Sequence, residues 1–192
     1  MILLAGPSGS GKSRLAVRSG LPILNLDDFY RTGDDPALPR FPSGSVDWDH
    51  PGSWHAGQAM AAVLRLCETG LVRVPRYDIS ANGPVGEQDL DLDGAAVFIA
   101  EGIFAAELVS QCRAAGVLRA AICVRRSRWV TMVLRFGRDL REHRKPVGVL
   151  LRRGWHLAMA EPAIVRGLQE KGCDCRSPAE VERFLSGPTG SA

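Results

Sequence analysis

The feature that most constrains the fold of this chain is the stretch GPSGSGKS at residues 6–13. It satisfies the spacing G-x-x-x-x-G-K-[ST] in full, and a loop of this type joins a buried strand to a helix. The apolar run Met1–Ala5 precedes it, and a helix-like run at residues 12–20 follows it. Because an apolar strand precedes the motif and a helix follows it, we predict a phosphate-binding loop between a buried parallel strand and a helix.

Each residue type in this loop serves the binding of phosphate. Glycines let the backbone wrap closely around the ligand and turn successive N–H groups toward it. Lys12 can reach the β- and γ-phosphates as a point charge, and the Ser13 hydroxyl can hold Mg²⁺. The motif alone does not separate phosphoryl transfer from hydrolysis or a mechanical switch. We expect ATP, with Mg²⁺ as the cofactor, to be bound by Gly6, Ser8, Gly9, Ser10, Gly11, Lys12 and Ser13.

Apolar runs and helical patterns alternate along the rest of the chain, which favours a parallel sheet covered on both faces. We predict an α/β fold, a three-layer α/β/α sandwich of the P-loop NTPase type with about five parallel strands. A β-hairpin flap is expected at about residues 71–92, and an arginine-bearing helical lid at about 127–146. The further strands are predicted at residues 21–28, 95–102, 118–124 and 172–175, and the further helices at 53–70, 104–116, 147–161 and 177–185.

Composition limits the class of protein. The 192 residues suit one domain, 1–192, with a tail at 187–192 that we expect to be disordered. The five cysteines form no CxxC pair, which argues against a disulfide framework or zinc site.

No apolar run approaches the roughly 20 residues of a membrane span, so we expect a cytoplasmic protein without a membrane partner. A net charge of +3 does not by itself imply a nucleic-acid partner. A homo-oligomer is compatible with these numbers.

Three acids follow predicted strands and therefore lie where ligands bind in such sheets. Asp27 and Asp28 end the second predicted strand, and an Asp there can accept a proton from an acceptor hydroxyl. Glu101 follows another apolar strand, the pattern of an acid that holds or orients Mg²⁺. Taken alone, the acids could also serve only to end the strands with soluble residues.

Arginines gather in residues 119–153, which hold ten Arg and one Lys. Three interpretations are open: a nucleic-acid surface, a bias of composition (21 Arg against 3 Lys), or a lid that closes over ATP. Few aromatics are available there to stack on bases, so we expect no nucleic-acid partner. A lid supplies positive charge and excludes water. We assign the lid to Arg135 and Arg138, and the bias of composition to Arg119, Arg125 and Arg126.

Several segments together make the chain resemble the uridine kinase family of nucleoside kinases. They occur in the family's order over about residues 2–145, and the segment DDFYR followed by DWDHP is the most specific. The resemblance implies ATP- and Mg²⁺-dependent phosphorylation of the 5′-hydroxyl of a pyrimidine nucleoside in nucleotide salvage. The segments are GPSGSGKS, LDDFYR, DWDHP, VPRYD, AEGIF and LRFGRDLREHRK.

The resemblance also implies roles for individual residues. Asp27 matches the family's general base, Glu101 its magnesium-site acid, and Asp49 the acid that binds the ribose hydroxyls. Tyr30 and Tyr77 match residues that line the nucleoside pocket, and Arg135 and Arg138 match lid arginines that meet nucleoside and phosphates. Asn82 stands where the family commonly has a His that reads the pyrimidine edge.

Two alternatives to a nucleoside kinase stay open. One is a P-loop kinase for another small hydroxylated metabolite, such as a sugar phosphate or a pantothenate-like molecule. The other is a nucleotide-dependent switch or adaptor that hydrolyses ATP slowly. Asp27, Asp49 and the flap argue against the switch, because it has no need of an acceptor pocket.

Overall fold

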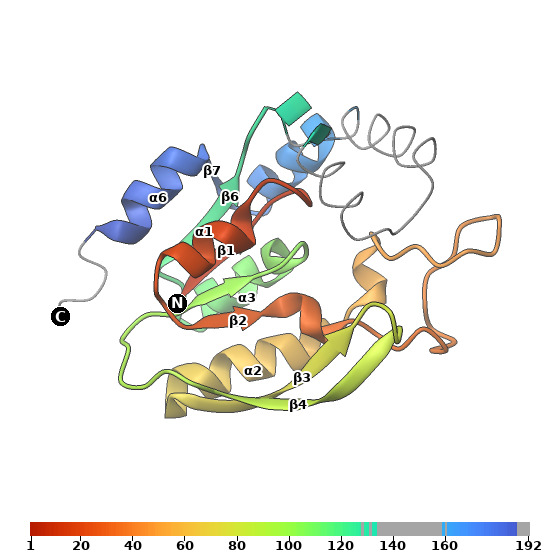
Figure 1. Ribbon diagram of the computed structural model, residues 1–192, viewed down its shortest axis with the longest axis horizontal. Coiled ribbons are helices and arrows are strands. Elements are labelled where there is room, and N and C mark those ends of the chain that lie inside the picture. The colour runs from red at the N-terminus through yellow and green to blue at the C-terminus, as the bar shows by residue number, and fades with distance from the viewer. Residues whose placement is uncertain (128, 131, 134–158, 160, 188–192) are drawn as a thin grey trace.

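The computed structural model describes residues 1–127, 129–130, 132–133, 159 and 161–187 (Figure 1). Five strands form one sheet in the order β2-β5-β1-β6-β7, and every neighbouring pair is parallel. This confirms the predicted α/β class and parallel sheet. The strands are β1 (Ile2–Ala5), β2 (Ile23–Asn25), β5 (Ile99–Glu101), β6 (Ala120–Val124) and β7 (Asp174–Arg176).

Helices cover both faces of this sheet, which makes the three predicted layers. Ile2 and Leu4 of β1 pack with the α1 and α6 side chains, whereas Leu3 packs with α2 and α3. Successive residues of a strand point to opposite faces, so an uninterrupted apolar run suits a strand buried on both sides. The helices are α1 (Lys12–Arg18), α2 (Ala56–Thr69), α3 (Val109–Ala114) and α6 (Pro178–Ser186), with a further helical segment at 161–170.

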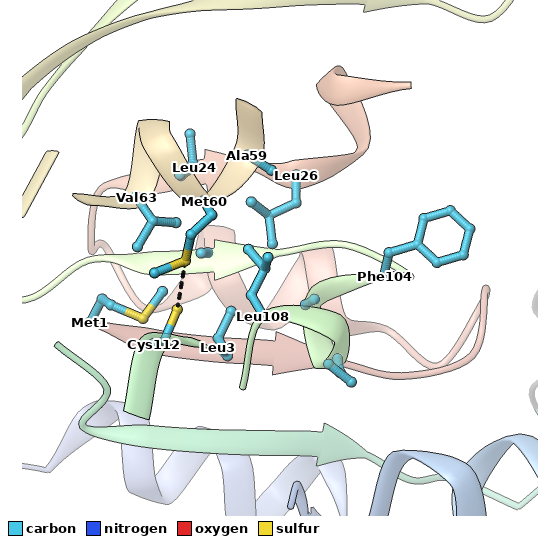
Figure 2. Packing of buried hydrophobic residues seen from close by; sticks show 14 of the residues in the cluster. Met1, Leu3, Leu24, Leu26, Ala59, Met60, Val63, Phe104, Leu108 and Cys112 are labelled. Atoms are coloured by element: carbon cyan, nitrogen blue, oxygen red, sulfur yellow. Dashed lines mark hydrogen bonds between the residues drawn. The ribbon is translucent and has the colours of Figure 1, made fainter. Parts of the chain in front are cut away.

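Figure 2 shows the larger core cluster, in which side chains from α2 meet the sheet and α3. Cys112 of α3 donates a hydrogen bond from Sγ to Met60 Sδ at 3.7 Å. Leu24 and Leu26, on either side of the end of β2, are fully buried in the same cluster. The core thus holds the segment that carries Asp27 against the sheet.

The predicted hairpin is present as β3 (Leu71–Asp78) and β4 (Gly83–Asp91), which pair antiparallel. The pairing register shifts between Arg76 and Tyr77. The two strands form a separate sheet and run alongside α2 (Figure 1). We call residues 71–91 the flap.

The structure corrects the predicted second strand, which we expected to run to Asp28. The strand ends at Asn25, and residues 26–29 form the short 3-10 helix η1 (Leu26–Phe29). The Asn25 side chain accepts a hydrogen bond from Asp27 N at 3.2 Å and so replaces a strand partner. The other short 3-10 helices are η2 (Pro51–Ser53) and η3 (Ala105–Leu108), the latter in the region predicted to open the helix at 104–116.

Three predictions fall largely where the chain is not described: the lid, the helix at 147–161 and the tail. Most of the predicted lid, including Arg135 and Arg138, lies outside the described residues, as do residues 188–192 of the predicted tail. Within the described ranges, no helix combines the length and apolar character needed to cross a bilayer.

Trp54, two residues before α2, forms a hydrogen bond to η1. Its indole is 3% exposed, and Nε1 donates a hydrogen bond to the Leu26 carbonyl at 2.6 Å. The Trp54 ring also packs against Phe104, with the ring centroids 5.7 Å apart. Since Leu26 directly precedes Asp27, this contact helps to fix the position of that carboxyl.

Trp54→Phe should therefore destabilise the protein by about 1–3 kcal/mol, because the buried Leu26 carbonyl loses its donor. Urea unfolding measures the effect. Trp129→Phe is the matched control, since Trp129 is 41% exposed, and it should change the free energy of unfolding little. Equal effects of the two substitutions would contradict the anchoring role of Trp54.

Candidate active site

The phosphate loop lies against the carboxyl ends of β1 and β6. Gly6 has φ = 150°. A Cβ added to it would lie 2.9 Å from both the Val124 carbonyl oxygen and Ser10 Oγ. No side chain fits in that space, so the loop can follow this tight path only with glycine at position 6. The predicted context, strand then loop then helix, is present as β1, residues 6–11 and α1.

Two polar side chains of the loop, Ser10 and Lys12, are buried. Lys12 is 6% exposed and Ser10 is 1% exposed. Ser10 Oγ has no hydrogen-bond partner among the described residues. A buried polar group normally has one, so the loop is suited to a ligand that accepts and donates hydrogen bonds.

Asp27 lies just after β2, close enough to Lys12 for the two charges to interact. Its Oδ1 accepts a hydrogen bond from Ile103 N at 3.0 Å. A Cβ on Gly102 would approach that oxygen to 2.8 Å, so glycine there lets the two segments meet. Burial raises the pKa of Asp27 above its ordinary value, and the opposing effects of Lys12 and the Ile103 N–H are smaller.

Asp28 points in another direction and holds the flap. It is 7% exposed, and its Oδ1 accepts a hydrogen bond from Tyr77 N at 3.1 Å. Burial raises the pKa of Asp28, and the Tyr77 N–H opposes this. Of the two adjacent acids, Asp27 thus lies near Lys12, and Asp28 joins η1 to β3.

Glu101, the last residue of β5, is 7% exposed. Burial raises its pKa, whereas Lys12 and the Ser13 hydroxyl lower it. Its Oε2 has no hydrogen-bond partner among the described residues. A carboxylate and a hydroxyl are ligands that Mg²⁺ accepts, and this cation keeps several waters, so Ser13 and Glu101 fit the predicted metal site. No group of three or more His, Cys, Asp or Glu in the described ranges is placed to hold a metal.

Aromatic rings gather beside Asp27. The Tyr30 ring packs against Trp48, Tyr77 and Phe104, with centroid distances of 5.9, 5.7 and 5.8 Å. The Tyr30 hydroxyl donates to the Trp48 carbonyl at 3.2 Å, and the Tyr77 hydroxyl donates to the Arg31 carbonyl at 3.4 Å. Burial raises the pKa of Tyr30 and of Tyr77, so both hydroxyls stay protonated. Sequence reasoning predicted the two tyrosines and missed Trp48 and Phe104.

The two other residues that we predict to bind the acceptor, Asp49 and Asn82, are exposed. Asp49 is exposed, and its charge helps to raise the pKa of Tyr30, which places it near that ring. Asn82 is exposed at the turn of the flap with φ = 50°. Its backbone carbonyl accepts a hydrogen bond from Gly33 N at 2.7 Å, which joins the tip of the flap to the loop after Tyr30. The binding roles of these residues remain predictions.

One residue beside the loop was missed by sequence reasoning. Arg126, which we assigned to a bias of composition, lies with its Nη2 3.7 Å from the point that a Cβ on Gly11 would occupy. Spacing within the arginine-rich segment gives no signal for this, because the contact depends on the pairing of β6 with β1.

Comparison with known proteins supports the resemblance. No protein-family model matches the chain. It is 28% identical over 112 residues to a uridine kinase of Saccharomyces cerevisiae (strain ATCC 204508 / S288c), a match that covers 55% of this chain and 22% of that protein. The chain therefore spans about a fifth of the length of this curated relative. The resemblance to the uridine kinase family is confirmed by this similarity.

Solved structures support the fold. The crystal structure of a 'putative fructose transport system kinase' from Silicibacter sp. TM1040 superposes with a TM-score of 0.65 at 17% identity, over 92% of this chain and 87% of that one. Phosphoribulokinase from Rhodobacter spheroides gives a TM-score of 0.47 at 16% identity, over 83% and 63% of the two chains. The first superposition confirms the predicted three-layer α/β/α fold.

The partly buried carboxyl of Asp27 should lower the stability of the protein at neutral pH. Because its pKa is raised on folding, the folded chain holds the proton more tightly than the unfolded chain does. Stability from this group is greatest below about pH 4 and is lost as the pH rises through the raised pKa. Asp27→Asn should therefore raise the Tm by about 2–4 °C at pH 7.5, the shift that about 1 kcal/mol gives in a domain of this size. The gain should vanish near pH 4.

Asp35→Asn is the control of opposite sign. Arg31 Nη1 donates to Asp35 Oδ2 at 2.8 Å, and this hydrogen bond lowers the pKa of Asp35. Stability from that pair is present above the ordinary pKa of Asp35 and is lost as the pH falls through the lowered value. Asp35→Asn should lower the Tm at pH 7.5. A lower Tm for Asp27→Asn at pH 7.5 would show that burial does not dominate at position 27.

Proposed function

We propose that this chain is an ATP- and Mg²⁺-dependent kinase that phosphorylates the 5′-hydroxyl of a pyrimidine nucleoside. The observation that carries the proposal is the position of Asp27, a partly buried carboxyl whose charge interacts both with Lys12 of the phosphate loop and with the Tyr30 hydroxyl. A kinase needs a carboxylate at the junction of donor and acceptor. The similarity in sequence to a uridine kinase supports the choice of acceptor.

Asp27 orients the acceptor hydroxyl and accepts its proton. The Ile103 N–H holds Oδ1 in place, and the other oxygen is assigned to the acceptor. A pKa raised by burial makes the carboxylate a stronger base than an exposed Asp, because the best base has a pKa near the working pH. The proton passes from the acceptor oxygen to Asp27 as that oxygen bonds to the γ-phosphorus and ADP leaves.

Positive groups stabilise the charge on the transferring phosphoryl group. Lys12 and the loop N–H groups contact the phosphates, and Arg135 and Arg138 are assigned to the closing lid. Ser13 and Glu101 would hold Mg²⁺, which neutralises charge on the β- and γ-phosphate oxygens when bound. Catalysis of this kind depends on position and electrostatics, with little covalent work by the protein.

The aromatic cluster and its neighbours bind the acceptor. Tyr30 and Tyr77 offer ring faces to a flat base, and their protonated hydroxyls are fixed by backbone carbonyls. The Asp49 carboxylate accepts from two adjacent ribose hydroxyls. Asn82 offers the base edge one donor group and one acceptor. A nucleotide switch has no use for this cluster, which argues against that alternative.

A second candidate acceptor is a small sugar or sugar phosphate. The Asn82 side chain has a shorter reach than the His that the related kinases commonly carry. The backbone carbonyl of Asn82 accepts a hydrogen bond from Gly33 N, which joins the tip of the flap to the loop after Tyr30. A shorter side chain on a docked flap favours an acceptor without a base. Asp27 would serve the same role in this reaction.

A panel of acceptors separates these candidates. ADP formation is measured with ATP, Mg²⁺ and one acceptor at a time: uridine, cytidine, adenosine, fructose, ribose 5-phosphate and pantothenate. The proposal expects uridine and cytidine to give the largest kcat/KM. Stimulation by a sugar alone would transfer the assignment to the second candidate. ADP formation that no acceptor stimulates would overturn both.

Asp27→Asn should lower kcat by about 10²–10⁴-fold, the usual contribution of a positioned base. The affinity for ADP, measured by calorimetry, should stay nearly the same, since Asp27 is assigned to the acceptor. Asp28→Asn is the matched control, because Asp28 bonds the flap and not the loop. It should lower kcat far less than Asp27→Asn does. Equal losses in the two variants would remove the distinction between these acids.

A further inference from the structure

The chain that leaves β6 borders the phosphate loop on the side away from the acids. In the sheet, β1 lies between β5, which carries Glu101, and β6. The Val124 carbonyl at the end of β6 touches the loop at Gly6, and two residues later the Arg126 guanidinium reaches Gly11. The loop therefore has carboxylates on one flank and an arginine on the other.

Arg126 carries a donor to which no described residue offers an acceptor. Its Nε is buried and has no hydrogen-bond partner among the described residues. The adjacent Arg125 is exposed, and its backbone N donates to the Arg176 carbonyl at 2.8 Å. Leaving a buried charged donor unpaired is costly. Arginine has only donors and keeps its charge, so the partner that suits this position is an anion.

The buried atoms around the loop that have no partner among the described residues differ between its two flanks, with an acceptor on one flank and a donor on the other. Glu101 Oε2, on the β5 side, is an acceptor and suits a cation, whereas Arg126 Nε, on the β6 side, is a donor and suits an anion. Ser10 Oγ, the third such atom in the described ranges, belongs to the loop itself. Magnesium bound to a polyphosphate has both charges that these flanks match.

We propose that Arg126 is a further binding residue for the phosphate donor, and that it contacts the polyphosphate of the nucleotide from the β6 side of the loop. The inference rests on the proposed function only in taking a nucleoside triphosphate as the donor. The planar guanidinium can give two parallel N–H groups to phosphate oxygens, and this geometry distinguishes phosphate from other anions. Arg126 then acts on donor affinity and leaves the choice of acceptor to the opposite flank.

Binding of three ligands to wild type and Arg126→Met tests this. ATP, ADP and inorganic tripolyphosphate, each with Mg²⁺, are titrated by competition against a fluorescent ADP analogue. We expect Arg126→Met to raise the Kd of all three by about tenfold or more, the loss of one charge-assisted hydrogen bond. Arg125→Met, the exposed neighbour, is the control and should leave every Kd nearly unchanged. In turnover assays, KM for ATP should rise while KM for the nucleoside stays the same.

Three results would overturn the proposal. Arg126→Met could bind ATP as tightly as wild type, or Arg125→Met could lose as much affinity. Tripolyphosphate could keep its affinity while ATP loses it, which would place Arg126 against the base. If Arg126→Met fails to fold, Arg126→Lys keeps the charge without Nε, and its Kd for ATP must rise for the proposal to hold. A wild type that binds ATP but phosphorylates no nucleoside would refute the proposed acceptor and leave this inference intact.

Discussion

The close approach of the phosphate loop to the end of β6 is the constraint on which the rest of the site depends. A Cβ at Gly6 would lie 2.9 Å from the Val124 carbonyl, so this contact exists only with glycine. It also needs β6 in parallel register with β1, where Ala5 lies opposite Cys123. With the loop fixed there, the order of strands separates the charges. Carboxylates come from β5 and η1 on one flank, and the arginine after β6 comes from the other.

In the mechanism that we propose, function and stability oppose each other at Asp27. Asp27 and Glu101 have raised pKa values because both are buried, and Lys12 offsets only part of that effect. An exposed Asp would cost less but would be a weaker base and would sit in water. The Trp54–Leu26 hydrogen bond and the fully buried leucines beside β2 supply the packing that holds Asp27 in this unfavourable setting.

How far sequence reasoning reaches depends on the range of each interaction. The loop, β1 and the hairpin were predictable because a motif, an apolar run and turn residues are local signals. The end of β2 was predicted wrongly, since the Asn25 side chain competes with the strand for the Asp27 N–H. The different positions of Asp27 and Asp28 could not be predicted from the sequence, because each depends on a distant hydrogen-bond donor. Ile103 N, 76 residues from Asp27, bonds that carboxyl, and Tyr77 N, 49 residues from Asp28, bonds the other. Arg126 was missed for the same reason.

In the reaction that we propose, the γ-phosphoryl group is transferred to an acceptor hydroxyl and not to water. Phosphorus-31 NMR of the protein with ATP, Mg²⁺ and uridine follows that group directly. A new phosphomonoester signal that grows as the γ-phosphate signal declines, with little inorganic phosphate, is the result that our account predicts. Inorganic phosphate as the only new product, formed at the same rate without uridine, would contradict it.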